Sequence, residues 1–264
     1  MMADETITDA TRAWLRAPSP AMAADCELTF LDRLAINSAC ATAQHAAYAE
    51  ALRTAGLGVT VLPALPGHAD CAFIEDCLVL VPEARLAIAT RPGAASRQGE
   101  VGSALAGLGE GWRHAALEAP GTLEGGDVLR LGQRLYVGQS TRTNAAGTAQ
   151  LAALVAPHGL EVVPVPVRGS LHLKTAVTAL GEGLFAANRA WFDPAPFGPA
   201  EWLDVAADEP FAGNTLSAGG RVILPAAHRR MADALAARGL VVLPVAIGEF
   251  AKAEAGVTCL SVLA

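Results

Sequence analysis

The sequence has no long apolar run. Hydrophobic residues make up 52% of the 264 residues and the mean hydropathy is +0.35, yet no segment reaches the roughly 18–20 consecutive apolar residues that a membrane helix needs. The first residues, MMADETITDATRAW, are acidic and polar, and they lack the basic start and apolar core of a signal peptide. We therefore predict a flexible tail over residues 1–12, a single domain over 13–264, no membrane association and a cytoplasmic location.

Positive charge and paired cysteines are also scarce. With 19 basic and 26 acidic residues the formal net charge is −7, which argues against a nucleic-acid partner and suits a cationic small ligand. The cysteines are five in number, widely scattered and never in the C-x-x-C spacing of a zinc site. We predict neither a disulfide framework nor a metal site.

The sequence does contain a weak internal repeat. Three segments share one plan, in which a helix ends at a glycine, a β-rich run closed by proline follows, and a loop leads to a second apolar run. Two weaker copies lie between them. About five such units indicate either a closed, propeller-like ring of α/β units or an ordinary open α/β sheet, and the repeat alone favours neither. The segments are 53–80, 156–180 and 236–264, with weaker copies at 111–138 and 222–240.

Alanine-rich stretches between the β-rich runs favour helices. In two of them apolar side chains recur four residues apart and share one helix face, at Tyr48 and Leu52 and at Met231 and Leu235. The predicted helices span residues 38–55, 100–109, 145–158 and 226–238.

Polar and reactive residues occupy equivalent loops of successive units. If the units close into a ring, these loops converge on one axis and build a single site from distant parts of the chain. The residues are Asp70, Glu75 and Asp76 in the first unit, Glu124 and Asp127 in the second, His172 in the third, Asn214 in the fourth and Cys259 in the fifth.

The local patterns around these residues leave structural readings open. SLHLKT and TCLSVL alternate as strands do, so His172 could be a hydrogen-bonded core histidine and Cys259 a buried thiol. In LEGGDVL, two glycines behind Glu124 allow unusual backbone angles and close approach. The arginines at positions 91, 97 and 142 are either solvated or suited to a carboxylate ligand.

Six stretches, in this order, resemble the dimethylarginine dimethylaminohydrolases of the guanidine-modifying (pentein) superfamily. They are HADCAFIED, ATRPGAASRQGEV, LEGGDVL, YVGQSTRTNAAG, LHLKT and GVTCLS, and the resemblance runs from about Gln44 to the C-terminus. It implies a five-bladed, pseudo-symmetric α/β propeller, here a single catalytic domain over 13–264. It also implies hydrolysis of Nω-methylated arginine to citrulline and an amine, without metal or cofactor. The implied partner is a small guanidinium amino acid, and a homodimer is left open.

The resemblance also implies roles for individual residues. Cys259 corresponds to the nucleophile, His172 to the general acid and base, and Glu124 to its carboxylate partner. The other positions correspond to substrate contacts. Glu75 and Asp76 face the guanidinium, Asp70 the α-amino group, Arg97 and Arg142 the α-carboxylate, and Leu28 and Ala253 supply backbone contacts.

The chain departs from the family pattern at the substrate end of the site. Residues 16–45, which include Leu28 and form a lid in the family, match poorly. Gln98 stands in place of a second basic residue, and the spacer between Asp76 and Arg91 is longer. These differences bear on how the substrate is bound more than on the catalytic residues.

Three other functions are compatible with the sequence. One is the hydrolysis of arginine or another substituted guanidine. An arginine deiminase has the same cysteine, histidine and carboxylates, but usually carries an added helical domain for which this chain has no room. A non-catalytic binding module on the same fold would not need Cys259 and His172. An amide hydrolase would need an oxyanion hole, in which three substrate-facing carboxylates are unhelpful.

Overall fold

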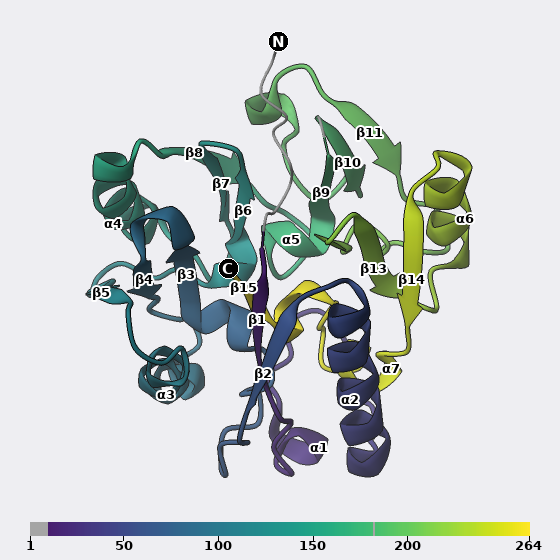
Figure 1. Cartoon of the computed structure of the whole chain (residues 1–264), viewed down its shortest axis with the longest axis horizontal. Coiled ribbons are helices and arrows are strands. Elements are labelled where there is room, and N and C mark those ends of the chain that lie inside the picture. Colours follow the sequence, from purple (N-terminus) through teal and green to yellow (C-terminus); the bar gives the residue numbers. More distant parts are fainter. Residues whose placement is uncertain (1–9, 182) are drawn as a thin grey trace.

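Five three-stranded sheets are arranged around a common centre (Figure 1). The structure is a computed structural model and describes residues 10–181 and 183–264. In each sheet the middle strand runs antiparallel to one neighbour and parallel to the other. The predicted propeller is confirmed, and the open sheet is excluded.

Four of the sheets use three consecutive strands, and the fifth joins the two ends of the chain. Along the chain the four are β3 (Leu78–Val81), β4 (Leu86–Ala89) and β5 (Arg113–Ala116); β6 (Val128–Leu131), β7 (Arg134–Gln139) and β8 (Glu161–Pro166); β9 (Val177–Gly181), β10 (Leu184–Ala187) and β11 (Glu201–Asp204); and β12 (Leu216–Ala218), β13 (Arg221–Pro225) and β14 (Val241–Val245). The fifth has the order β15 (Val262–Leu263), β1 (Arg12–Arg16) and β2 (Gly58–Leu62).

Parallel strands need a crossover, and in four of the five sheets this crossover contains a helix; β10 and β11 are joined by a segment with only a 3₁₀ turn, Ala195–Phe197. The four longer helices, α2 (Ser38–Thr54), α3 (Val101–Gly107), α4 (Ala145–Val155) and α6 (Arg229–Ala237), confirm the predicted ones. They lie outside the sheets in Figure 1. Three single-turn helices complete the set: α1 (Met22–Asp25), α5 (Leu173–Ala176) and α7 (Gly248–Ala251).

The signals that predicted the helices have physical counterparts in the structure. Tyr48 and Leu52 of α2 are fully buried, as is Leu235 of α6, which gives each helix an apolar face against its sheet. Asn144 caps α4 by accepting a hydrogen bond from Gly147 N at 2.8 Å. The glycines that end three of the repeat helices, Gly56, Gly159 and Gly239, have φ values of +94°, +73° and +80°, which only glycine adopts without strain.

Two predicted strands are instead helical turns. His172 is extended but directly precedes α5, and Thr258–Leu260, which contains Cys259, is a 3₁₀ turn. The strands begin later, at Val177 and Val262, where each can pair with the middle strand of its sheet. Asp127 holds the first turn of α5 by accepting a hydrogen bond from Leu173 N, a contact that alternation of apolar residues does not encode.

The ends of the chain meet in the fifth sheet. Ala13 pairs with Leu263, and the Thr11 and Arg12 N–H groups both donate to Ala264 O at 2.8 Å. Residues 1–9 of the predicted tail lie outside the described residues, whereas its last residue, Arg12, begins β1. None of the helices in the described part of the chain is long and apolar enough to cross a membrane.

Candidate active site

Reactive residues from four of the five units converge on one cavity, whereas Glu75, Asp127 and Asn214 do not line it. Each lies in or next to the turn that leads into the first strand of its sheet: Ile74–Cys77 before β3, Gly125–Asp127 before β6, α5 before β9 and Thr258–Leu260 before β15. These turns surround this small cavity of about 30 Å³, which is partly open to solvent. Among its lining residues are Asp70, Asp76, Arg97, Glu124, Arg142, His172, Ala253 and Cys259.

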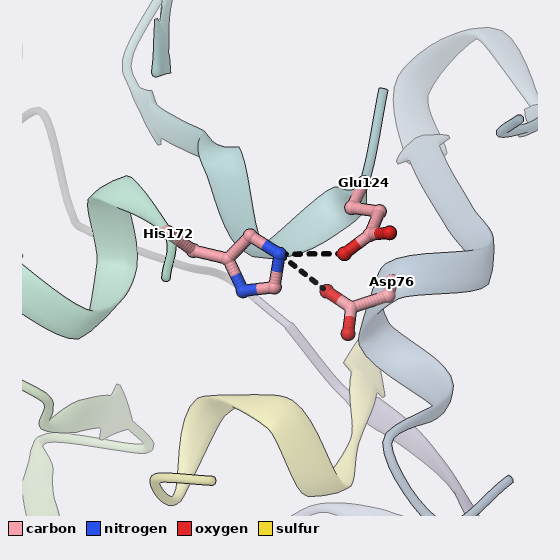
Figure 2. A group of neighbouring side chains, drawn as sticks. All are labelled: Asp76, Glu124 and His172. Atoms are coloured by element: carbon pink, nitrogen blue, oxygen red, sulfur yellow. Dashed lines mark hydrogen bonds and ion pairs between the residues drawn. The ribbon is translucent and has the colours of Figure 1, made fainter. Parts of the chain in front are cut away.

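One ring nitrogen of His172 faces two carboxylates (Figure 2). Its Nε2 is 2.7 Å from Glu124 Oε2 and 3.9 Å from Asp76 Oδ1, and all three side chains are at most 3% exposed. Burial alone lowers the pKa of this imidazole, but Asp76, the hydrogen bond to Glu124 and the nearby Asp127 together raise it to about 9. At neutral pH the ring is therefore an imidazolium that can donate a proton.

The two glycines after Glu124 make room for this arrangement. A Cβ on Gly126 would lie 2.6 Å from His172 Nδ1 and 2.8 Å from Asp76 Oδ1, and a Cβ on Gly125 would lie 2.0 Å from Glu75 O. Neither belongs to the positive-φ glycines of the described residues. Close approach, and not an unusual backbone angle, is what requires glycine here.

Cys259 is a buried thiol at the edge of the same cavity, 7% exposed. Burial, together with the carboxylates of Glu75 and Asp76, raises its pKa to about 12. The sulfur is therefore protonated at neutral pH in the absence of a ligand. A cation placed beside it would favour the thiolate, which is the nucleophilic form.

Glu75 forms an ion pair that sequence reasoning missed. Lys174 Nζ lies 2.6 Å from Glu75 Oε1, and the two side chains are 15% and 11% exposed. The other oxygen, Oε2, is buried without a hydrogen-bond partner. Glu75 is not among the residues that line the cavity, but its charge helps to raise the pKa of Cys259.

Arg97 is already saturated with acceptors. Its guanidinium forms ion pairs with Asp76 at 2.5 Å and Glu100 at 2.8 Å, and it donates to the carbonyl oxygens of Asp70 and Phe73. It lines the cavity while bracing the turn that carries Asp76. Arg91, in contrast, donates to Gly121 O and does not line the cavity.

Residues 27–31 cover the substrate end of the cavity and occupy its polar groups. Glu27 N donates to Asp70 Oδ2 at 3.1 Å, and Arg142 Nη2 donates to Thr29 Oγ1 at 3.0 Å. Burial raises the pKa of Asp70 to about 6, against the lowering effect of Arg97. Leu28 is half-buried against the core beneath this segment and is not among the cavity-lining residues, whereas Ala253 is.

Glu254 is a second residue that sequence reasoning missed. It also lines the cavity, and its Oε1 accepts the backbone N–H groups of Thr29, Phe30 and Leu31 at 2.9, 2.5 and 2.6 Å. Its φ of +61° is one of two positive values among the non-glycine residues described. No sequence signal marks this contact, which spans more than 220 positions.

Asp76, Glu124 and His172 have the donor set of a metal site, with donor atoms within 4.8 Å of one another. An imidazolium has no free lone pair for a metal, so a metal would have to displace the proton that the carboxylates stabilise on His172. The absence of a metal and of a cofactor stays a prediction.

Comparisons with known proteins agree with the fold and the motifs. The chain is 40% identical over 256 residues to a dimethylarginine dimethylaminohydrolase of Streptomyces coelicolor, covering 95% of this chain and 96% of that protein. It is 35% identical over 221 residues to the Pseudomonas aeruginosa enzyme of the same name, covering 83% and 86%. No protein-family model matches.

Solved structures give the same answer. A cysteine-to-serine mutant of the Pseudomonas aeruginosa enzyme in complex with citrulline superposes with a TM-score of 0.90 at 32% identity, over 97% of this chain and 99% of that one. The N-terminal domain of a cyanobacterial arginine dihydrolase matches with a TM-score of 0.84 at 19% identity, which shows a shared fold. The chain belongs to the dimethylarginine dimethylaminohydrolase family.

Proposed function

We propose that this protein hydrolyses Nω-methylated arginine to citrulline and dimethylamine or methylamine, with Cys259 as nucleophile, His172 as general acid and base and Glu124 as the partner of His172. The observation that carries the proposal is the placement of a thiol and a carboxylate-held imidazolium on one cavity. Family membership supports the reaction.

The carboxylates prepare the site for a guanidinium. Asp76, Glu75 and Glu124 make the cavity favourable for a cation and unfavourable for a thiolate alone. Binding of the guanidinium supplies a positive charge beside Cys259, which lowers the thiol pKa and releases its proton to solvent. The nucleophile is thus formed when its substrate is present.

Catalysis then proceeds in two displacements. The thiolate adds to the guanidinium carbon, and His172 donates its proton to the methylated nitrogen as the C–N bond breaks, which leaves an S-alkylthiouronium on Cys259 and a free amine. His172, now neutral, takes a proton from water, and the hydroxide adds to the same carbon. As the C–S bond breaks, the hydroxyl group of the adduct loses its proton to solvent, and citrulline and the thiolate are released.

The remaining site residues are proposed to bind the amino-acid end. Asp70 is suited to the α-amino group, Arg142 to the α-carboxylate, and Ala253 to a backbone contact. Arg97 and Leu28 are assigned by resemblance, and in the ligand-free structure both have other contacts. A homodimer and a cytoplasmic location remain part of the prediction.

A substrate panel tests the proposal. We expect citrulline from dimethylarginine and monomethylarginine, little from arginine, and none from any of them with Cys259→Ser. Mass spectrometry of the parent after treatment with 2-chloroacetamidine should place the adduct on Cys259. If the protein turned over arginine but neither methylated arginine, the proposed substrate would be wrong. If the Cys259→Ser variant were active, the assignment of Cys259 as nucleophile would be wrong.

A further inference from the structure

Asn214 occupies the fourth of the five equivalent loops, and the reaction described above gives it no task. It is 2% exposed and lies just before β12, the first strand of its sheet. Its position in the repeat matches those of Glu124, His172 and Cys259, yet it does not line the candidate active-site cavity. An amide cannot transfer protons as these groups do, so its role must lie in its contacts.

The Asn214 amide joins the two segments that carry the reacting groups. Nδ2 donates to Lys174 O in α5 at 2.8 Å and to Thr258 Oγ1 at 3.0 Å, and Oδ1 accepts from Thr258 N at 3.3 Å. Lys174 is two residues from His172, and Thr258 adjoins Cys259. One side chain therefore spans from the histidine segment to the cysteine segment.

The surroundings allow this amide little freedom. A Cβ on Gly256 would lie 2.1 Å from Asn214 Oδ1 and 2.3 Å from its Cγ, so the amide occupies the space of the missing side chain. A Cβ on Gly213 would lie 2.5 Å from Ala176 O, so the Asn214 backbone packs directly on the end of α5. These close contacts hold Asn214 against both segments.

We propose that Asn214 is a positioning residue, which ties α5 to the Thr258–Leu260 turn and thereby sets the separation and orientation of His172 and Cys259. Only a group with a donor and an acceptor on one rigid plane satisfies all three contacts. The inference rests on the proposed roles of His172 and Cys259. A misplacement of about 1 Å between reacting groups can cost about a hundredfold in rate.

The test compares four variants in the full chain. Asn214→Ala removes the whole amide, Thr258→Val removes one of its partners, and Thr258→Ser restores that partner. Asn188→Ala is the matched control, because the Asn188 side chain donates to Pro210 O and accepts from Ala190 N, and so joins neither reacting segment. Its backbone N–H, which the substitution keeps, donates to Ala176 O at the end of α5. The readouts are kcat and KM for dimethylarginine, the melting temperature, and the rate of Cys259 alkylation by iodoacetamide at several pH values below the Cys259 pKa, where the rate follows the thiolate fraction.

For Asn214→Ala we expect kcat to fall about a hundredfold with KM changed less than about threefold, since the proposed substrate contacts lie elsewhere. The alkylation rate at each pH should fall, because the segment with His172 and Lys174 moves its positive charges away from the thiol and the thiolate fraction decreases. Thr258→Val should show part of both effects, and Thr258→Ser should recover most of the activity. Asn188→Ala should match the parent in kcat and in alkylation.

A kcat within about threefold of the parent in Asn214→Ala overturns the inference. If that variant does not fold, a parental kcat and alkylation profile in Thr258→Val overturns it. A hundredfold loss of kcat in Asn188→Ala also overturns the inference, because the loss of kcat would then follow from removing any buried amide. If the parent turns over no guanidine substrate, the proposed function fails, and the alkylation profiles still decide whether Asn214 controls the surroundings of Cys259.

Discussion

Neighbouring carboxylates keep the imidazole of His172 protonated. A buried imidazole without partners would be neutral at pH 7, and here Asp76 and Glu124 reverse that tendency. The proton is then available for the leaving amine without a preceding transfer. The same balance makes the imidazolium sensitive to each carboxylate.

The pH dependence of kcat should reflect this balance, because bound substrate has then already converted the Cys259 thiol to the thiolate. With the pKa of His172 near 9, kcat should fall as pH rises through about 9, because the imidazolium is lost. In Glu124→Gln the His172 pKa falls, since a hydrogen-bonded charge is removed, and this limb should move to lower pH. An unchanged limb in a kinetic pH titration would contradict the assignment.

The same proton contributes to stability. Because the folded-state pKa of His172 lies above the ordinary value of 6.5, its contribution is complete below about pH 6.5 and is lost as pH rises through about 9. The melting temperature of the parent should therefore drop more steeply between pH 7 and 10 than that of His172→Gln. Parallel melting curves of the two proteins would argue against a raised pKa.

Gly126 offers a test of close packing under the imidazole. Gly126→Ala places a methyl group 2.6 Å from His172 Nδ1, and we expect kcat to fall about a hundredfold as the ring is displaced. The control is Gly102→Ala in α3, where a Cβ meets nothing within 4 Å. It should keep its activity and gain about 0.5–1 kcal/mol in the free energy of unfolding, since alanine favours helix. Equal kinetics for both variants would mean that the imidazole can move freely.

At the scale of elements, the segment over the cavity is held by one carboxylate. Glu254 Oε1 accepts three successive N–H groups, from Thr29 to Leu31, and hydrogen bonds to a charged group are the stronger kind. Because Glu254 is five residues from Cys259, the covering segment is anchored to the segment that carries the nucleophile.

Amide hydrogen exchange can measure that anchor. In Glu254→Ala, exchange at residues 29–31 should accelerate at least about tenfold, since hydrogen bonds to a charge are worth about 1.5–3 kcal/mol each. Glu254→Gln keeps an acceptor but no charge and should lie between. Glu110→Ala, an exposed carboxylate after α3, serves as the control. Parental exchange in Glu254→Ala would show that other contacts hold the segment.

At the scale of the whole molecule, the features that the sequence predicted are those of the repeating units of the ring. Helix ends at Gly56 and Gly159 and the buried pair Tyr48 and Leu52 are local signals, and they predicted the units correctly. The order of the six motifs then placed the reactive residues at the centre.

The remaining features depend on distant contacts. The Lys174–Glu75 pair joins residues 99 positions apart, and Glu254 contacts residues more than 220 positions away. The helical turns at His172 and Cys259 are three or four residues long, too short for periodicity to separate from strand. They depend on partners such as Asp127, which only the folded ring brings near.

Closure of the ring by β15 should be required for activity. Deletion of residues 262–264 removes the pairing with β1, the buried Val262 and the acceptor of two N–H groups. We expect a lower melting temperature and loss of citrulline formation together, because Cys259 is held just before this strand. Val241→Ser on the exposed side of β14, where the side chain is 55% exposed, should affect neither. Full activity of the truncated chain would contradict this.

Because the two ends of the chain meet in one sheet, the ring could be opened at a different loop without a change in its chemistry. A circular permutant with the natural ends joined and new termini between Ala207 and Asp208, both exposed, would keep every sheet with its own strands. In such a chain Cys259 would lie shortly before the linker that leads to the original N-terminus. It would no longer lie near an end of the chain. We expect it to form citrulline at a rate close to the parental one. The late position of Cys259 would then be a consequence of where the ring is opened and not a requirement of the reaction.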